Sequence, residues 1–198
     1  MDSKSWRPER GSASDVMLLA PDSPDDAALA EVLAALETLR REAAAPVALP
    51  IRPHAARLPS QERAVSRVFL AAVRRFYETH GGLDLTMERV CKGAPSECVS
   101  VCRLTLSTGL SLAESVAHVA ERDGLARARA QVGRARGFFS YSWTGTRLEE
   151  MLGAIDDVVA PLEGGDGEAA ARVWVDMFCA SQNLLAGAYR DAAVTREA

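Results

Sequence analysis

The sequence predicts an α/β protein with a mostly helical N-terminal half followed by a strand–helix–strand unit. Three observations predict this class. Apolar residues recur at helical spacing between residues 25 and 122. Two short apolar runs, residues 138–141 and 171–178, are too compact for helices, and an amphipathic segment separates them. A strand, a helix and a strand in close succession predict parallel pairing and a right-handed crossover.

The first two segments are a polar terminus and a helix with a linker. Residues 1–24 are polar with scattered proline and serine, and we expect them to be disordered. Residues 25–59 are expected to form a helix and then a proline-rich linker, which begins after Pro46. Two acidic residues open this helix, where they suit its dipole. Its apolar stripe consists of Leu29, Val32, Leu33, Leu36 and Leu39.

Residues 60–135 are predicted to be a helical region. We expect helices over residues 60–79, 86–91, 95–105 and 111–122. Ser60 is expected to cap the first of them, and two glycines follow its end. Ser111 and Glu114 have the spacing of a capping box, and Gly124 follows as the expected stop.

Residues 136–198 are predicted to contain the strand–helix–strand unit. We expect residues 138–141 to be a buried strand and residues 171–178 to be a second one. Thr144 or Thr146 is expected to cap the helix between them. The apolar face of that helix consists of Leu148, Met151, Leu152, Ile155 and Val159. Because two strands leave faces and edges uncovered, either the N-terminal helices cover them or the chain is part of a longer domain, and we expect the latter.

Composition excludes several classes of function. With 23 basic and 27 acidic residues the formal charge is −4, so neither a nucleic acid nor an anionic membrane is expected as a partner. No run of about 18 apolar residues is present, and we expect no membrane span. The four cysteines are too unevenly spaced for a disulfide framework, so free thiols and a cytoplasmic location are expected.

Two motifs carry a resemblance to a known family. The first is RGFFSYSWTGT, residues 136–146, and the second is RVWVDMFCASQN, residues 172–183. In this order they resemble the opening strands of TIR domains, and the stretch WVDMFCASQ is similar to fungal HET domains. They also resemble TIR-like proteins of algae and other protists, in which a V-G-x-A motif precedes the first strand, as residues 132–135 do here.

The resemblance implies the start of a flavodoxin-like fold that ends after its second strand. Its firm part covers residues 132–182. It implies a signalling or self-association module whose partners are like domains, met through strand edges and the helix after the first strand. Two alternatives remain open, which are a nucleotide-cleaving domain that uses NAD and a truncated structural remnant without activity.

The ends of the two predicted strands supply the candidate ligand-binding residues. In open parallel sheets, ligands bind beyond the carboxyl ends of the strands. An aromatic ring beside hydroxyl groups could stack a nucleobase and bind a ribose. The candidates are Ser140, Tyr141, Ser142, Trp143, Thr144, Asp176, Ser181 and Gln182. The alternative is that Trp143 and Trp174 fill a core or an interface, while the small polar residues form turns and caps.

Catalysis by cleavage of NAD is not the expected activity. In TIR domains that are NAD hydrolases, a glutamate follows a motif that residues 184–189 resemble, but Arg190 stands at its position. A guanidinium cannot act as a general base. Asp191 is one residue further, about 100° away on a helix. Asp176 and Asp191 therefore remain weak catalytic candidates, and NAD is the cofactor they would imply.

A metal site is not expected either. Cys91, Cys98 and Cys102 with His118 could be proposed as zinc ligands, but they lie on separate predicted helices and form no C-x-x-C knuckle. Buried free thiols are the expected state of these cysteines. Cys179 has no histidine near it in sequence to activate it.

Overall fold

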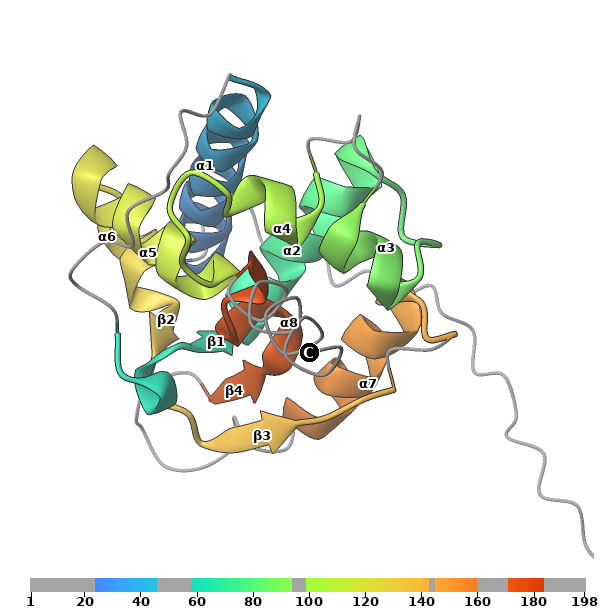
Figure 1. Cartoon of the computed structure of the whole chain (residues 1–198). Coiled ribbons are helices and arrows are strands. Elements are labelled where there is room, and N and C mark those ends of the chain that lie inside the picture. The colour runs from blue at the N-terminus through green and yellow to red at the C-terminus, as the bar shows by residue number, and fades with distance from the viewer. Residues whose placement is uncertain (1–23, 46–57, 94–98, 143–144, 160–170, 184–198) are drawn as a thin grey trace, which may run out of the picture.

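The protein is a mixed α/β structure in which helices pack over a four-stranded sheet (Figure 1). The computed structural model describes residues 24–45, 58–93, 99–142, 145–159 and 171–183. The helices are α1 (Pro24–Ala44), α2 (Arg67–His80), α3 (Met87–Lys92), α4 (Val101–Leu104), α5 (Leu112–Asp123), α6 (Ala126–Ala130), α7 (Leu148–Val159) and α8 (Asp176–Cys179), with a 3₁₀ turn η1 (Ser60–Glu62). The strands are β1 (Ala64–Ser66), β2 (Val132–Gly133), β3 (Gly137–Phe139) and β4 (Arg172–Val175). The expected disordered terminus up to residue 23 and most of the expected linker lie outside the described residues.

The two best-marked N-terminal helices are confirmed. In α1, Val32, Leu36 and Leu39 are buried, and the two acidic residues occupy its first turn. In α5 the expected capping box is present, because the Ser111 hydroxyl accepts from the Glu114 N–H and the Glu114 carboxylate accepts from the Ser111 N–H. The helix stops at Gly124, whose φ of 73° is the left-handed conformation that glycine tolerates best.

The helix expected from Ser60 is wrong in its first turns. Residues 60–62 form a 3₁₀ turn, residues 64–66 form strand β1, and α2 begins only at Arg67. Ser66 caps α2 by accepting from the Phe69 N–H at 3.2 Å. β1 is too short to show a strand pattern of its own. Its pairing with β2 on one side and β4 on the other stabilises it, and local sequence does not report such pairing.

The position of this cap gives a direct test of β1. Ser66→Ala should lower the free energy of unfolding by about 1–2 kcal/mol, because the buried hydroxyl caps α2 and also donates to Gln131 Oε1 at 2.6 Å. Ser60→Ala, at an exposed residue outside any helical cap, should change it by less than about 0.5 kcal/mol. Urea unfolding followed by circular dichroism measures both. A larger loss for Ser60→Ala than for Ser66→Ala would indicate that the helix begins at Ser60, and it would contradict β1.

Two further expectations in this region need correction. The helix expected over residues 95–105 starts at Val101 in the described residues, where Ser100 caps it through the Arg103 N–H. α6 and strand β2 both fall within the segment expected to be purely helical. β2 has only two residues, and its pairing with β1 is what makes it a strand.

The strand–helix–strand unit is confirmed as parallel. β3 and β4 pair in register, with Phe138 opposite Trp174. α7 connects them and buries all five residues of the apolar face that the sequence predicted. β4 ends at Val175 and not at Phe178 as expected, because the chain turns there into α8.

β3 is an edge strand and not the buried strand that its composition suggested. In the sheet order β2-β1-β4-β3 it lies at one end, and the described residues pair it only with β4 (Figure 1). The side chain of Phe138 is 67% exposed. The opposite side of β4 pairs with β1 in antiparallel fashion, so the N-terminal half contributes strands to the sheet as well as covering helices.

One face of the sheet is packed against the helices. Val65, Val132 and Val173 are cross-strand partners, so they share a face, and all three are buried. Figure 1 shows α1, α2 and α5 gathered above the sheet in this view, with β3 at its lower edge. Within the described part of the chain, no helix has both the length and the apolar character needed to cross a bilayer.

Candidate functional site

The carboxyl ends of β3 and β4 bring together two of the residues that the sequence nominated. Tyr141 follows β3, Asp176 follows β4, and both side chains are half-buried. Burial, followed by the negative charge of Asp176 and a hydrogen bond with it, raises the pKa of Tyr141 well above its ordinary value. The phenol therefore stays protonated, and the interaction of the two side chains joins the ends of β3 and β4.

Asp176 also fixes the start of α8. Its Oδ1 accepts from the Met177 N–H at 2.7 Å, which satisfies one of the donors that a helix N-terminus leaves unpaired. Its backbone carbonyl accepts from Gln182 Nε2 at 2.8 Å. The carboxylate is thus committed to Tyr141 and to its own helix.

Gln182, another candidate ligand-binding residue, is buried and connects the carboxyl ends of β3 and β4 to the N-terminal helices. Its Oε1 lies 3.6 Å from Cys91 Sγ, which donates to it from α3. The next residue, Asn183, donates through Nδ2 to the Cys102 carbonyl at 2.9 Å and to Thr105 Oγ1 at 3.0 Å. These contacts fasten the segment after α8 onto α3 and α4.

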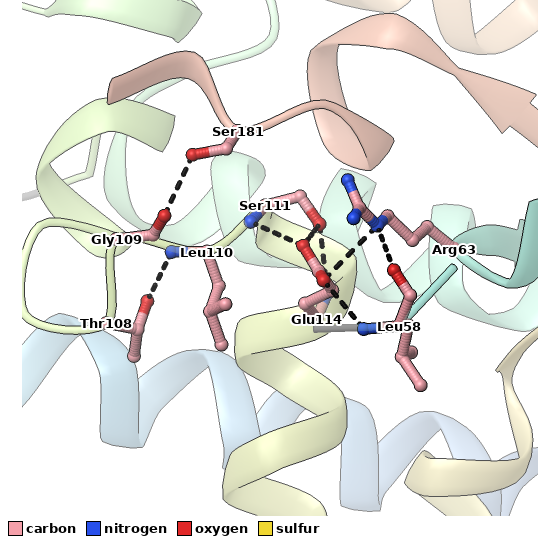
Figure 2. Close-up of polar contacts among 8 residues, drawn as sticks. All are labelled: Leu58, Arg63, Thr108, Gly109, Leu110, Ser111, Glu114 and Ser181. Carbon is pink, nitrogen blue, oxygen red and sulfur yellow. Dashed lines mark hydrogen bonds and ion pairs between the residues drawn. The ribbon is translucent and has the colours of Figure 1, made fainter. Parts of the chain in front are cut away.

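The remaining nominated residues do not converge on this corner. Ser181 donates to the Gly109 carbonyl at 2.9 Å, so its hydroxyl faces the loop before α5 (Figure 2). Ser140 and Ser142 are exposed. Trp143, Thr144, Arg190 and Asp191 lie outside the described residues, and with them the stretch that resembles the NAD-hydrolase motif.

A hollow lies at the opposite end of β3. It has a volume of about 660 Å³ and is lined by Ser60, Gln61, Ala135, Arg136, Gly137, Phe138 and Trp174. Phe138 and Trp174 stack across the two strands, with ring centroids 5.1 Å apart and planes 18° apart. Trp174, which the sequence suggested as a core or interface residue, is half-buried and lines the hollow beside the exposed ring of Phe138.

Cys91 and Cys102 were considered above as zinc ligands, but a contact between them was not predicted from the sequence. Cys91 and Cys102 lie with their sulfur atoms 3.9 Å apart, although they belong to different helices. No spacing rule predicts this contact, because it depends on how α3 and α4 pack. In the described ranges, no three or more His, Cys, Asp or Glu side chains form a group that could hold a metal ion. Cys98, part of the zinc site considered above, lies outside them.

At the carboxyl ends of β3 and β4, the polar side chains hold parts of the chain together. Tyr141, Asp176, Gln182 and Ser181 each direct a polar group at another part of the chain. A general base or a ribose-binding carboxylate must instead face the substrate. The exposed Phe138 ring, stacked on the half-buried Trp174, is a better candidate for a contact surface. Comparison of the chain with protein-family models, curated proteins and solved structures finds no match.

Proposed function

We propose that this protein is a TIR/HET-like signalling or self-association module that is not catalytic and that pairs with like domains through the edge of β3. The observation that carries the proposal is the exposure of Phe138 on an edge strand, where it stacks on Trp174. An edge strand presents backbone donors and acceptors that a second strand can pair with. A large exposed aromatic beside such an edge is typical of a contact surface.

The charges around β3 suit a partner that is a second copy of the chain. Antiparallel pairing of two β3 strands centred on Phe138 sets Arg136 of each copy opposite Ser140 of the other. No like charges then face each other across the pair, and the two Phe138 rings meet at its centre. This arrangement is isologous and therefore closes as a dimer.

The state of the candidate acid supports the absence of catalysis. The Asp176 carboxylate accepts from the Met177 N–H and interacts with the Tyr141 phenol, so its oxygen atoms are engaged within the chain. The sequence places an arginine, Arg190, where NAD-cleaving relatives of the family have their glutamate.

The test replaces the exposed ring with a charge. Phe138→Asp should raise the dissociation constant of self-association at least tenfold, or about 1.4 kcal/mol, because it places two carboxylates at the centre of the interface. Sedimentation velocity over a concentration series measures this. The free energy of unfolding should fall by only about 1–2 kcal/mol, because Phe138 is 67% exposed and the change removes its stacking on Trp174 and places aspartate in a strand.

Val158→Asp is the matched control. Val158 is the other large apolar residue that the described part of the chain exposes, at 51%, and it lies on α7 and not on a strand. Because the resemblance also implies contacts through this helix, the variant separates α7 from the edge of β3. It should leave association unchanged. Association lost in Val158→Asp but kept in Phe138→Asp would move the interface to α7, and a wild-type chain that stays monomeric at high concentration would contradict self-association. Release of nicotinamide from NAD, abolished by Asp176→Asn, would contradict the non-catalytic part.

A further inference from the structure

Two cysteines that are eleven residues apart in sequence meet at the junction of α3 and α4. The Sγ atoms of Cys91 and Cys102 are 3.9 Å apart. Cys91 is buried, with 3% of its surface exposed, whereas Cys102 is half-buried and within reach of small solutes. A disulfide needs an S–S distance of about 2.05 Å, so the two atoms must approach by roughly 1.9 Å. The two residues lie on helices of only six and four residues.

The two thiols differ in their protonation. A hydrogen bond from Cys91, followed by the positive charge of Lys92, outweighs the effect of burial and lowers the pKa of Cys102. The same hydrogen bond and then burial raise the pKa of Cys91. Cys102 is therefore the thiol that becomes a thiolate, and Cys91 keeps its proton. A half-exposed thiolate beside a buried thiol is the arrangement in which one sulfur reacts with an oxidant and the other resolves the product.

We propose that Cys91 and Cys102 form a reversible redox pair that a peroxide oxidises to a disulfide, with Cys102 as the attacking sulfur and Cys91 as the resolving one. This inference does not depend on self-association. It rests on the distance between the sulfur atoms, on the unequal exposure of the two residues and on their links to residues 182–183.

The reaction balances with hydrogen peroxide as the oxidant. The Cys102 thiolate attacks one peroxide oxygen, the S–O bond forms, the O–O bond breaks, and the hydroxide released takes up the proton that Cys102 gave up. Cys91 then loses its proton and attacks the Cys102 sulfur, the S–S bond forms, and the second hydroxide leaves as water. Two thiols lose two electrons in total, and one peroxide becomes two water molecules.

Oxidation has a structural consequence at the strand ends. The single thiol proton of Cys91 is shared between Cys102 Sγ and Gln182 Oε1, and a disulfide has no proton to donate to either of them. Gln182 Nε2 also donates to the Asp176 carbonyl, so the disulfide removes the contact of Cys91 with Oε1 and leaves the contact with Asp176 in place. The redox state of the cysteines is thereby coupled to the corner that carries Asp176 and Tyr141.

The experiment treats the folded full-length chain with hydrogen peroxide, blocks remaining thiols and maps the peptides by mass spectrometry. Trypsin separates Cys91 from a peptide that carries both Cys98 and Cys102, so the Cys98→Ser variant is used for the assignment. We expect the two peptides to be joined in this variant, with a mass about 2 Da below the sum of the reduced forms, and to separate again on treatment with dithiothreitol. In Cys91→Ser, a sulfenic acid should accumulate at Cys102 and react with dimedone.

Cys179 serves as an internal control. It is fully buried, and burial raises its pKa to about 12, so it should remain a thiol at the same peroxide concentration. A linked peptide that forms in the wild type but not in Cys98→Ser would assign the disulfide to Cys98 and overturn the proposal. Oxidation of Cys102 to the sulfinic or sulfonic acid without any link to Cys91 would overturn it as well, as would equal reactivity of Cys102 and Cys179.

Discussion

Replacing Glu114 with alanine should lower the free energy of unfolding by about 3–5 kcal/mol, a large part of the total stability of a domain of this size. Glu114 has only 3% of its surface exposed. Its Oε2 accepts from the backbone N–H and the hydroxyl of Ser111 at 3.1 and 2.9 Å. Its Oε1 accepts from the Leu58 N–H at 3.1 Å and pairs with Arg63 Nε at 3.2 Å (Figure 2). Alanine would leave these donors, one of them a mostly buried cation, without the carboxylate.

Two further variants test whether the buried carboxylate causes this loss. Urea unfolding measures the free energy of unfolding of all three. Glu114→Gln keeps one oxygen acceptor in nearly the same shape but removes the charge, so about 1–2 kcal/mol should be lost. Glu121→Ala removes an exposed glutamate from the same helix, where it pairs with Arg129 at 2.6 Å, and should cost less than about 1 kcal/mol. Equal losses for Glu114→Ala and Glu121→Ala would show that Glu114 does not join α5 to the segment of Leu58 and Arg63.

This carboxylate also shows how far local sequence predicts the fold. The pairing of Ser111 with Glu114 follows from a spacing of three residues, and it was predictable because both partners lie in one helical turn. The contacts of the same side chain with Leu58 and Arg63 join segments that are far apart in sequence, and no local pattern encodes them. α7 was predictable for the first reason, since its apolar face repeats at helical spacing.

The strands show the limit more clearly. The unit of β3, α7 and β4 was predictable from two apolar runs with an amphipathic segment between them. β1 was not, because Val65, Val68 and Phe69 also fit a helical stripe, and only pairing with β2 and β4 makes residues 64–66 extended. The exposure of Phe138 was not predictable either. Whether an apolar strand is central or at an edge depends on its neighbours, which its own sequence does not specify.

At the candidate site, the rule about strand ends predicted that Tyr141 and Asp176 lie close together, but not the contacts that the other candidate residues make. The rule predicted this because the carboxyl ends of parallel strands meet at the same end of the sheet. The two side chains do interact in the structure. The rule did not predict that Gln182 and Ser181 turn inward to Asp176 and Gly109, which depends on α8 ending the strand early. The contact between Cys91 and Cys102 depends on the packing of α3 on α4, so a spacing rule could not find it.

Phe178→Ala should lower the free energy of unfolding by about 3–5 kcal/mol. Phe178 lies in α8 and is completely buried. Its ring packs against Phe69 of α2, with centroids 6.5 Å apart and planes tilted by 54°. Removing the ring opens a cavity between α8 and α2, and the close-packed surroundings can only partly fill it. Equilibrium unfolding in urea measures the loss, and Phe178→Leu, which keeps most of the volume, should cost less than about 1.5 kcal/mol.

Phe138→Ala is the comparison for Phe178→Ala, because it removes the same type of side chain from an exposed position. Phe138 is 67% exposed, so its loss should cost only the stacking on Trp174, about 0.5–1 kcal/mol, when measured at a protein concentration low enough to keep the chain monomeric. The two variants together test whether the face of β3 that carries Phe138 is uncovered. A loss in Phe138→Ala that equals the loss in Phe178→Ala would mean that this face is covered. The Phe138 ring would then not be available for contact with a second copy.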